Sequence, residues 1–215
     1  MKTFQEFIAE AAQQHGSVNL LFEQGMYSLM DDLERIVTVF RDGKISFEVI
    51  GGVAVNAYLL GAHRSRSFVT RDIDLLVQRQ DLQEIISAAE SAGYTGRKII
   101  GGFMLIRPGQ QPEEAVHLIF VGEKARSSHP LPNPVIHPEE KHLPEFGLSV
   151  PVARLRDLVH MKLNSFRPKD EAHLEILDKC GLLTPFIESD LPPVLKERLA
   201  QARKRFSVDE AEDEV

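Results

Sequence analysis

The sequence predicts an α/β (α+β) fold, in which a mixed β-sheet is flanked by helices and helical segments are added at both ends. Between positions 46 and 150, short apolar runs typical of strands alternate with helical patterns in the order βαβαβββ. With 215 residues, 43% of them hydrophobic, the chain has room for one substantial core. We therefore expect a helical cap over 1–45, a core over 46–150, a helical region over 151–206 and a disordered acidic tail over 207–215.

Helical spacing of apolar residues is the main feature of the amino-terminal segment. It extends over Phe4 to Gln14 and again over Met26 to Phe40. The second stretch carries an apolar stripe made of Leu29, Leu33, Ile36, Val37 and Phe40. We expect this stripe to cover the sheet.

A glycine pair lies at an expected strand-to-helix turn. Residues 47–50 read as a strand and residues 53–60 as an apolar helix closed by Gly61, so Gly51 and Gly52 fall between them. Without Cβ atoms, these glycines let phosphate oxygens approach the backbone, and the free N–H groups that open a helix attract negative charge. The pair indicates a phosphate-binding turn, although a tight structural turn would use the same residues.

Two acidic residues alternate with apolar residues in the next expected strand, over 72–77. Because successive side chains on a strand point to opposite faces, Asp72 and Asp74 would project from the same side. One or two carboxylates together with substrate phosphates are the usual ligands of Mg²⁺ in nucleotide sites. The pair predicts a site for Mg²⁺ (or Mn²⁺) and a nucleotide, and a solvated strand face is the alternative interpretation.

Together, Ile50-Gly51-Gly52 and Asp72-Ile73-Asp74 resemble the signature of the DNA polymerase β-like nucleotidyltransferase superfamily. The chain is most similar to small prokaryotic nucleotidyltransferase-like proteins of the abortive-infection and toxin-antitoxin type. In these proteins Gly-Gly-x-Ala opens a helix, as Gly51 to Ala54 would here, and Asp-Ile-Asp-Leu follows a basic loop. The resemblance spans roughly residues 45 to 180 and implies a nucleotidyltransferase-like core that uses a metal ion held by Asp72 and Asp74.

The basic loop lies between the glycine turn and the acid pair. It contains His63, Arg64, Ser65 and Arg66, and Arg71 follows it. Arginine side chains that open on the same cleft would bind a triphosphate or the phosphates of RNA through their planar donor groups. Exposed charges without a ligand are the alternative interpretation.

The resemblance also implies a third carboxylate on a neighbouring strand, which corresponds here to the expected strand over 115–122. The central polar residue of this strand is His117. A histidine at this place can ligate a divalent ion weakly, act as general base for an attacking hydroxyl, or indicate that turnover has been lost, and a hydrogen-bonded core histidine is the structural alternative. Glu113 and Glu114 precede the strand, and we interpret them as solvated loop residues.

The remaining segments complete the expected fold. Asp81 to Glu84 reads as a capping box before a helix that Gly93 ends, and residues 98–100 and 103–106 read as strands of a hairpin. Five prolines at 130, 132, 134, 138 and 144 predict an extended surface loop, which we expect to border the substrate cleft. A short strand is expected over 148–152.

A lysine lies inside the apolar stripe of the helix that follows this strand. The stripe contains Leu155, Leu158, Val159, Lys162, Leu163 and Phe166. Because an isolated buried charge costs several kcal/mol, a buried Lys162 requires a partner, and a nucleotide phosphate, Asp170 and Asp74 are the candidates. A lysine side chain that extends to the surface is the alternative interpretation. The resemblance favours phosphate, since related proteins carry Met-Lys-Leu in this helix. Asp170 would cap the next helix, over 171–179, and Arg167 and Lys169 read as loop charges.

Composition and charge narrow the class of protein. A formal net charge of −7 argues against broad electrostatic adhesion to nucleic acid, although a local basic patch can still bind RNA. Cys180 is the only cysteine, which excludes an internal disulfide and fits a reducing cytoplasm. The amino end lacks the apolar core of a signal peptide, and no apolar run approaches the ~20 residues that span a bilayer. We expect a cytoplasmic protein without a membrane partner.

Two functions follow from these features and from the resemblance. The first is a metal-dependent nucleotidyltransferase that moves a nucleoside monophosphate from an NTP, such as ATP, to a hydroxyl of an RNA, protein or small-molecule acceptor. Its predicted catalytic residues are Asp72, Asp74 and His117, and its predicted nucleotide contacts are Gly51, Gly52, Arg64, Arg66 and Lys162. The alternative is a catalytically impaired nucleotide-binding protein, or one half of a toxin-antitoxin pair, that has the same fold and an antitoxin-like partner.

Overall fold

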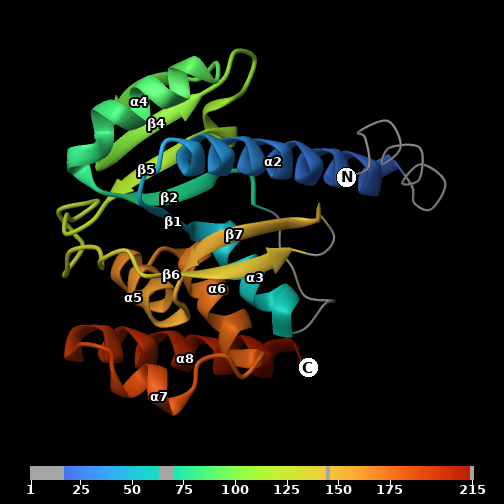
Figure 1. Ribbon diagram of the computed structural model, residues 1–215. Coiled ribbons are helices and arrows are strands. Elements are labelled where there is room, and N and C mark those ends of the chain that lie inside the picture. Colours follow the sequence, from blue (N-terminus) through green and yellow to red (C-terminus); the bar gives the residue numbers. More distant parts are fainter. Residues whose placement is uncertain (1–16, 63–69, 144–145, 214–215) are drawn as a thin grey trace.

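The computed structural model describes residues 17–62, 70–143 and 146–213, and a seven-stranded mixed sheet forms its centre (Figure 1). The strand order is β3-β4-β5-β2-β1-β7-β6. The strands are β1 (Phe47–Ile50), β2 (Ile73–Val77), β3 (Thr95–Ile99), β4 (Gly102–Ile106), β5 (Val116–Phe120), β6 (Pro138–Leu143) and β7 (Leu148–Ala153). The predicted mixed α/β fold with flanking helices is confirmed.

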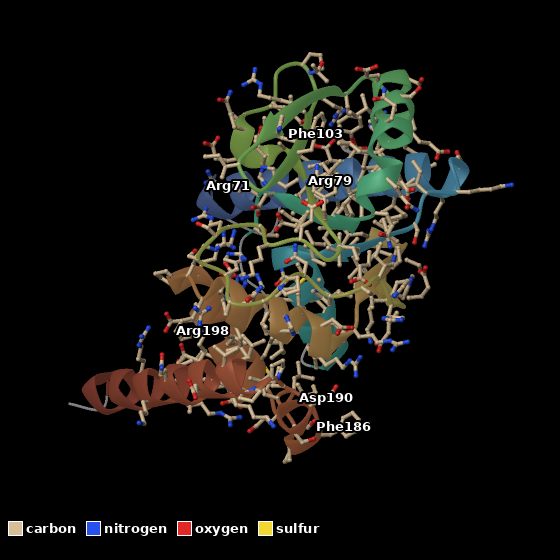
Figure 2. The ribbon with its side chains drawn as sticks, turned by 90° about the vertical axis from the view of Figure 1, so that its left-hand side faces the viewer. Arg71, Arg79, Phe103, Phe186, Asp190 and Arg198 are labelled. Atoms are coloured by element: carbon tan, nitrogen blue, oxygen red, sulfur yellow. The ribbon has the colours of Figure 1, made fainter. Side chains whose placement is uncertain are left out.

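Helices flank the sheet in two groups. They are α2 (Ser17–Asp42), α3 (Gly51–Ala62), α4 (Leu82–Ser91), α5 (Leu155–Ser165), α6 (Pro168–Lys179), α7 (Pro185–Ser189) and α8 (Pro193–Asp213), with short 3₁₀ turns η1 (Arg79–Asp81) and η2 (Pro112–Glu114). Helices α2 and α4 contact each other, whereas α3, α5 and α6 form a second group against which α8 packs (Figure 1). Arg198 of α8 donates hydrogen bonds to the carbonyl oxygens of Leu163 and Asn164, and so joins α8 to the end of α5 (Figure 2).

Helix α2 packs on the sheet through the predicted apolar stripe. All five residues of the stripe, Leu29, Leu33, Ile36, Val37 and Phe40, are buried. Asp32 on the same helix is also buried; it forms an ion pair with Arg107 and accepts a hydrogen bond from Gln110, both just after β4. This helix is therefore fixed by apolar burial and by a buried polar contact. The helix predicted over Phe4 to Gln14 lies outside the described residues.

The register of the central strands brings three distant segments together. Strand β2 pairs with β1 in antiparallel orientation, so Asp74 lies opposite Ile50, the last residue of β1. On its other side β2 pairs with β5 in parallel orientation, and there Asp74 lies opposite His117. Since Gly51 directly follows Ile50, the glycine turn, the acid pair and the histidine meet around one residue of β2.

The proline-rich segment differs from the expected loop. Its second half forms β6, which pairs with β7 over its whole length. Strand β6 is at the edge of the sheet, where a proline without an N–H group is tolerated, and Pro138 is its first residue. Prolines 130, 132 and 134 precede the strand, so the prediction of an extended loop is wrong over Pro138–Leu143, and Pro144 lies outside the described residues.

Two helix ends also differ from expectation. Asp81 precedes α4 but makes no side-chain capping bond, because it ends the η1 turn with a helical backbone (φ −84°, ψ −2°) instead of an extended one. At the carboxyl end, α8 continues to Asp213, through most of the segment expected to be a disordered tail. The residues at 210–212 are Glu-Ala-Glu, and glutamate and alanine are strong helix formers.

None of the helices in the described chain, including the long α2 and α8, is both long enough and apolar enough to cross a lipid bilayer.

A carboxyl group on the central strand β1, just before the glycine turn, is enclosed in the core. Glu48 on β1 is fully buried, and its Oε2 accepts a hydrogen bond of 2.9 Å from the backbone N–H of His137. The other oxygen, Oε1, has no hydrogen-bond partner within the described chain. Burial, together with the nearby carboxylate of Asp157, raises the pKa of Glu48 to about 7.

This raised pKa makes stability depend on pH. The folded chain binds the proton of Glu48 more tightly than the unfolded chain, so the stabilisation is complete below about pH 4.5 and is lost as pH rises through about 7. Between pH 5 and pH 8 we expect the wild-type protein to lose about 2 to 3 kcal/mol of unfolding free energy from this group. Urea unfolding of Glu48→Gln at both pH values should not show this loss, whereas the exposed control Glu90→Gln should retain it. An unchanged pH dependence in Glu48→Gln would show that the group is not responsible.

Candidate functional site

Two carboxylates and an imidazole converge at the carboxyl end of β1. Asp72, Asp74 and His117 each offer one ligand atom, and these atoms all lie within 4.8 Å of one another. The Nδ1 atom of His117 is 3.6 Å from Oδ1 of Asp74. The structure thus brings together the three residues that the sequence predicts to be catalytic.

Local contacts fix the acid pair. Asp74 lies within β2, whereas Asp72 lies just before it, where the hydroxyl of Thr70 donates a hydrogen bond of 3.0 Å to Asp72 Oδ1. The Nζ atom of Lys169, from the first turn of α6, is 3.5 Å from Asp72 Oδ2. The carboxylate of Asp72 therefore lies next to the positive charge of Lys169.

The two glycines of the turn lie very close to the side chains of Asp74 and Thr70. Gly51 has φ +69°, and a Cβ atom built on it would lie 2.0 Å from Oδ2 of Asp74. A Cβ atom on Gly52 would lie 2.5 Å from Oγ1 of Thr70. Only glycine allows both the backbone conformation and the distance at position 51. Gly51 lines the site, whereas Gly52 is buried against Thr70.

A cavity of about 270 Å³ opens beside the acid pair. Its charged lining residues are Asp72, Asp74, Arg126, Lys162, Arg167 and Asp170, and two histidines, His117 and His129, also line it. Its apolar lining comes from Ile50, Ile99, Ile100, Ile119, Ala125, Leu158 and Met161. The lining of one cavity thus combines acids, cations and apolar side chains.

Lys162 is buried in the wall of this cavity. Only 5% of its side chain is exposed, and its Nζ atom is 3.2 Å from Oδ1 of Asp170. Burial lowers the pKa of Lys162, while the charges of Asp170 and Asp74 oppose that shift. Of the partners that the sequence leaves open, Asp170 is the one in direct contact.

Asp170 joins two cations and a helix start. Burial alone would raise its pKa, but hydrogen bonds from Arg167 and the charge of Lys162 lower the pKa to about 2. Its carboxylate also accepts a hydrogen bond of 3.3 Å from the backbone N–H of Arg167, the residue before α6. Asp170 therefore caps α6 from inside the helix, at its third position. The prediction that the helix begins at 171 is wrong, because α6 begins at Pro168, and Lys169 lies in its first turn instead of in a loop.

The electrostatic states of Asp74 and His117 are linked. Burial would raise the pKa of Asp74, but the contact with His117 and the charges of Lys162 and Lys169 lower it below the usual value. The same contact with Asp74 raises the pKa of His117, against the effect of burial. The site therefore favours an ionised Asp74 with positive charge around it.

Several residues discussed from the sequence lie elsewhere. Arg64 and Arg66, with the rest of the basic loop over 63–69, lie outside the described residues. Arg71 is exposed and does not line the cavity. Glu113 and Glu114 are exposed in η2, where Glu114 accepts a hydrogen bond from the N–H of Gln111, so the interpretation as solvated loop residues is confirmed.

Three further lining residues of the cavity, Ile100, Arg126 and His129, were not predicted from the sequence. Arg126 and His129 come from the loop after β5, and Ile100, which is 95% exposed, lies at the tip of the β3–β4 hairpin. A Cβ atom on Gly101 would lie 1.8 Å from the carbonyl oxygen of Ala125, so the hairpin tip is packed against that loop. The glycines at 101 and 102 indicated a turn, but nothing in them indicated contact with the loop.

Residues 17–215 match the model of a protein family described as uncharacterised nucleotidyltransferase. Among solved structures, an antigenic nucleotidyltransferase-like protein from Paracoccidioides brasiliensis is similar, with a TM-score of 0.50 and 18% identity over 86% of this chain and 91% of that chain. This similarity shows the nucleotidyltransferase-like fold. No curated protein matches the sequence significantly.

Two structures of ANT(2'')-Ia are also similar, at lower scores. The antibiotic-resistance factor in solution has a TM-score of 0.41 and 15% identity, over 84% of this chain and 85% of that chain. The crystal structure of its complex with adenylyl-2''-tobramycin has a TM-score of 0.40 and 15% identity, over 84% of this chain and 90% of that chain.

Replacement of Gly51 tests the close approach at the turn. Gly51→Ala places a Cβ atom against Asp74 and forces alanine into a left-handed conformation, so we expect a loss of about 1 to 3 kcal/mol in unfolding free energy. Gly61→Ala is the matched control, because a Cβ atom there meets open space within α3. The control should be neutral or more stable by up to about 1 kcal/mol. Urea unfolding measures both variants, and equal stability of the two would contradict the packing described here.

Proposed function

Because this chain belongs to the uncharacterised nucleotidyltransferase family, we propose that it transfers a nucleoside monophosphate from a nucleoside triphosphate to a hydroxyl group of an acceptor. The convergence of Asp72, Asp74 and His117 beside Gly51, in a cavity of about 270 Å³, is the observation that supports this proposal. Nucleotidyl transfer needs a cation site, room for phosphates and positive charge in one place. The three residues offer ligand atoms for a cation, the cavity offers room, and Lys162 and Arg167 in its lining offer positive charge.

The donor set fits a divalent cation. Two carboxylates and one imidazole offer ligand atoms within 4.8 Å of one another, and the absence of a side chain at Gly51 leaves Asp74 Oδ2 space that a Cβ atom would fill. We propose Asp72, Asp74 and His117 as the residues that hold Mg²⁺ or Mn²⁺. Such an ion, when bound, neutralises phosphate charge and polarises the phosphoryl group.

The cations of the chain complement this centre. We propose that Lys162, held by Asp170, presents positive charge to the triphosphate from the cavity wall. Arg167 and Lys169 are about half exposed and pair with Asp170 and Asp72, so they add positive charge beside the place that we propose for the triphosphate. We propose that Gly51 and Gly52 contribute backbone at the start of α3. Arg64 and Arg66, which follow α3 in the sequence and lie outside the described residues, stay proposed phosphate contacts.

In the proposed reaction the acceptor hydroxyl oxygen attacks the α-phosphorus of the nucleotide. A new oxygen–phosphorus bond forms, the bond from the α-phosphorus to the bridging oxygen breaks, pyrophosphate leaves, and the hydroxyl proton is released to solvent water. Positioning and charge neutralisation provide most of the catalysis in phosphoryl-type transfer, and Asp72, Asp74 and Lys162 fit these tasks.

The core over 46–150 provides the acid pair, and the helical region over 151–206 provides Lys162, Arg167 and Asp170, so we propose that both are needed. RNA, protein and small-molecule acceptors are all compatible with this scheme.

A second candidate function is nucleotide or partner binding without turnover, as in one half of a toxin-antitoxin pair. The specific observation in its favour is His117, which stands where the resemblance implies a third carboxylate. In this case the cavity would bind a nucleotide and the protein would act through complex formation.

Asp74→Asn tests the proposed transfer. The amide keeps the volume but removes the charge between Gly51 and His117, so we expect a loss of about 10³-fold or more in the transfer of α-labelled nucleotide. The assay contains Mg²⁺ or Mn²⁺ with mixed RNA and protein acceptors. Asp81→Asn is the matched control, because Asp81 lies in η1, away from the cavity, and it should keep wild-type activity.

Binding without transfer would identify the second candidate. A nucleotide present at 100 times its dissociation constant should stabilise the wild-type protein by about 2.7 kcal/mol. Saturable stabilisation of the wild type without transfer to any acceptor would support the non-catalytic function and contradict the enzyme.

A further inference from the structure

One of the three proposed metal ligands is a nitrogen donor. His117 is held in the middle of the sheet, since β5 pairs with β2 on one side and with β4 on the other. Its side chain is 23% exposed and lines the cavity, with Nδ1 3.6 Å from Asp74 Oδ1. These features distinguish it from an enclosed core histidine, because the ring lies at the wall of the cavity and next to the acid pair.

The position of the ring is determined by the backbone. Asp74 and His117 are register partners on adjacent parallel strands, so their side chains point to the same face of the sheet. The residues that flank His117 along β5, Val116 and Leu118, are both buried on the opposite face, which prevents the strand from turning the ring away. A metal ion held by Asp72 and Asp74 would therefore meet an imidazole at this place.

Ligand chemistry then separates the common divalent ions. Mg²⁺ is a hard cation that prefers oxygen ligands and near-ideal octahedral geometry, whereas an imidazole nitrogen binds first-row transition ions more strongly. For a mixed nitrogen and oxygen site, affinity rises from Mn²⁺ to Co²⁺ in the order of that series. The carboxylates of Asp72 and Asp74 alone would suit Mg²⁺, so the preference depends on the third donor.

We propose that His117 makes this centre selective for a first-row transition-metal ion, such as Mn²⁺, over Mg²⁺. The proposal rests on the proposed function, in which Asp72, Asp74 and His117 hold the ion. It adds the class of metal ion that the site prefers, and it attributes this preference to His117.

The test measures ion binding, without any need for an acceptor. Isothermal titration of the full chain with Mn²⁺, Co²⁺ and Mg²⁺ in the absence of nucleotide gives three dissociation constants. For the wild type we expect Mg²⁺ to bind at least about tenfold more weakly than Mn²⁺, and Co²⁺ to bind more tightly than Mn²⁺. Equal affinities for Mg²⁺ and Mn²⁺, or no binding of any ion, would overturn the proposal.

Two substitutions at position 117 test whether His117 causes the preference for Mn²⁺ over Mg²⁺. His117→Asp converts the site into three carboxylates, so we expect Mg²⁺ to bind more tightly and the preference for Mn²⁺ to fall by about tenfold. His117→Asn removes the ring nitrogen without a new charge, and it should weaken Co²⁺ more than Mg²⁺. Unfolding curves confirm that each variant is folded before it is titrated. A preference for Mn²⁺ that is unchanged in both folded variants would contradict the role of His117.

Controls separate this proposal from the function on which it rests. His142→Asp makes the same change on the edge strand β6, where His142 is exposed and 3.1 Å from Ser149 Oγ, and it should keep wild-type selectivity. If Asp74→Asn leaves all ion binding unchanged, the proposed metal site itself is wrong. If Asp74→Asn abolishes ion binding while His117→Asp leaves selectivity unchanged, the site stands and only the assignment to His117 fails.

Discussion

The pairing of β2 between β1 and β5 is the constraint on which the site depends. It places Asp74 opposite Ile50 on one side and opposite His117 on the other. The chain must turn into α3 directly after Ile50, within van der Waals distance of the Asp74 carboxylate, and only a residue without Cβ fits there. A slip of β2 by one residue would point Asp74 to the opposite face of the sheet and would separate all three groups.

The charges around this point are costly to bury, and the fold compensates them in pairs. Asp170 is almost fully enclosed, yet it is satisfied by Arg167 and Lys162 together. Lys162 in turn is close enough to Asp74 to affect its pKa, and Lys169 faces Asp72. A buried charge without a partner would destabilise the protein by several kcal/mol, so this chain of alternating charges explains how ionised groups persist beside an apolar core. It also leaves positive charge next to the acid pair, where we propose that the triphosphate binds.

The apolar pattern anticipated most of the elements but not their pairing. The stripe from Leu29 to Phe40 and the strands at 47–50 and 148–152 follow from spacing alone, because burial on one face imposes that spacing. The strand β6 could not be anticipated, since Pro138 and the prolines on either side of the strand argue against a strand unless it is known to lie at an edge. The prediction that Asp81 caps α4 is wrong because Asp81 is the last residue of the 3₁₀ turn η1, which sets its backbone conformation.

The sequence by itself determined the two local motifs of the candidate site. A glycine pair between strand and helix, and two acids at alternate positions, have direct consequences for backbone shape and side-chain direction over a few residues. Only the tertiary structure decided which groups join them. His117 is 43 positions beyond Asp74 along the chain (117 minus 74) and becomes its neighbour through a parallel pairing, and Lys162 could have paired with phosphate, Asp74 or Asp170 until packing placed it on Asp170. The loop that carries Arg126 and His129 completes the cavity because Gly101 packs against it, and no periodic pattern in the sequence records a contact of that kind.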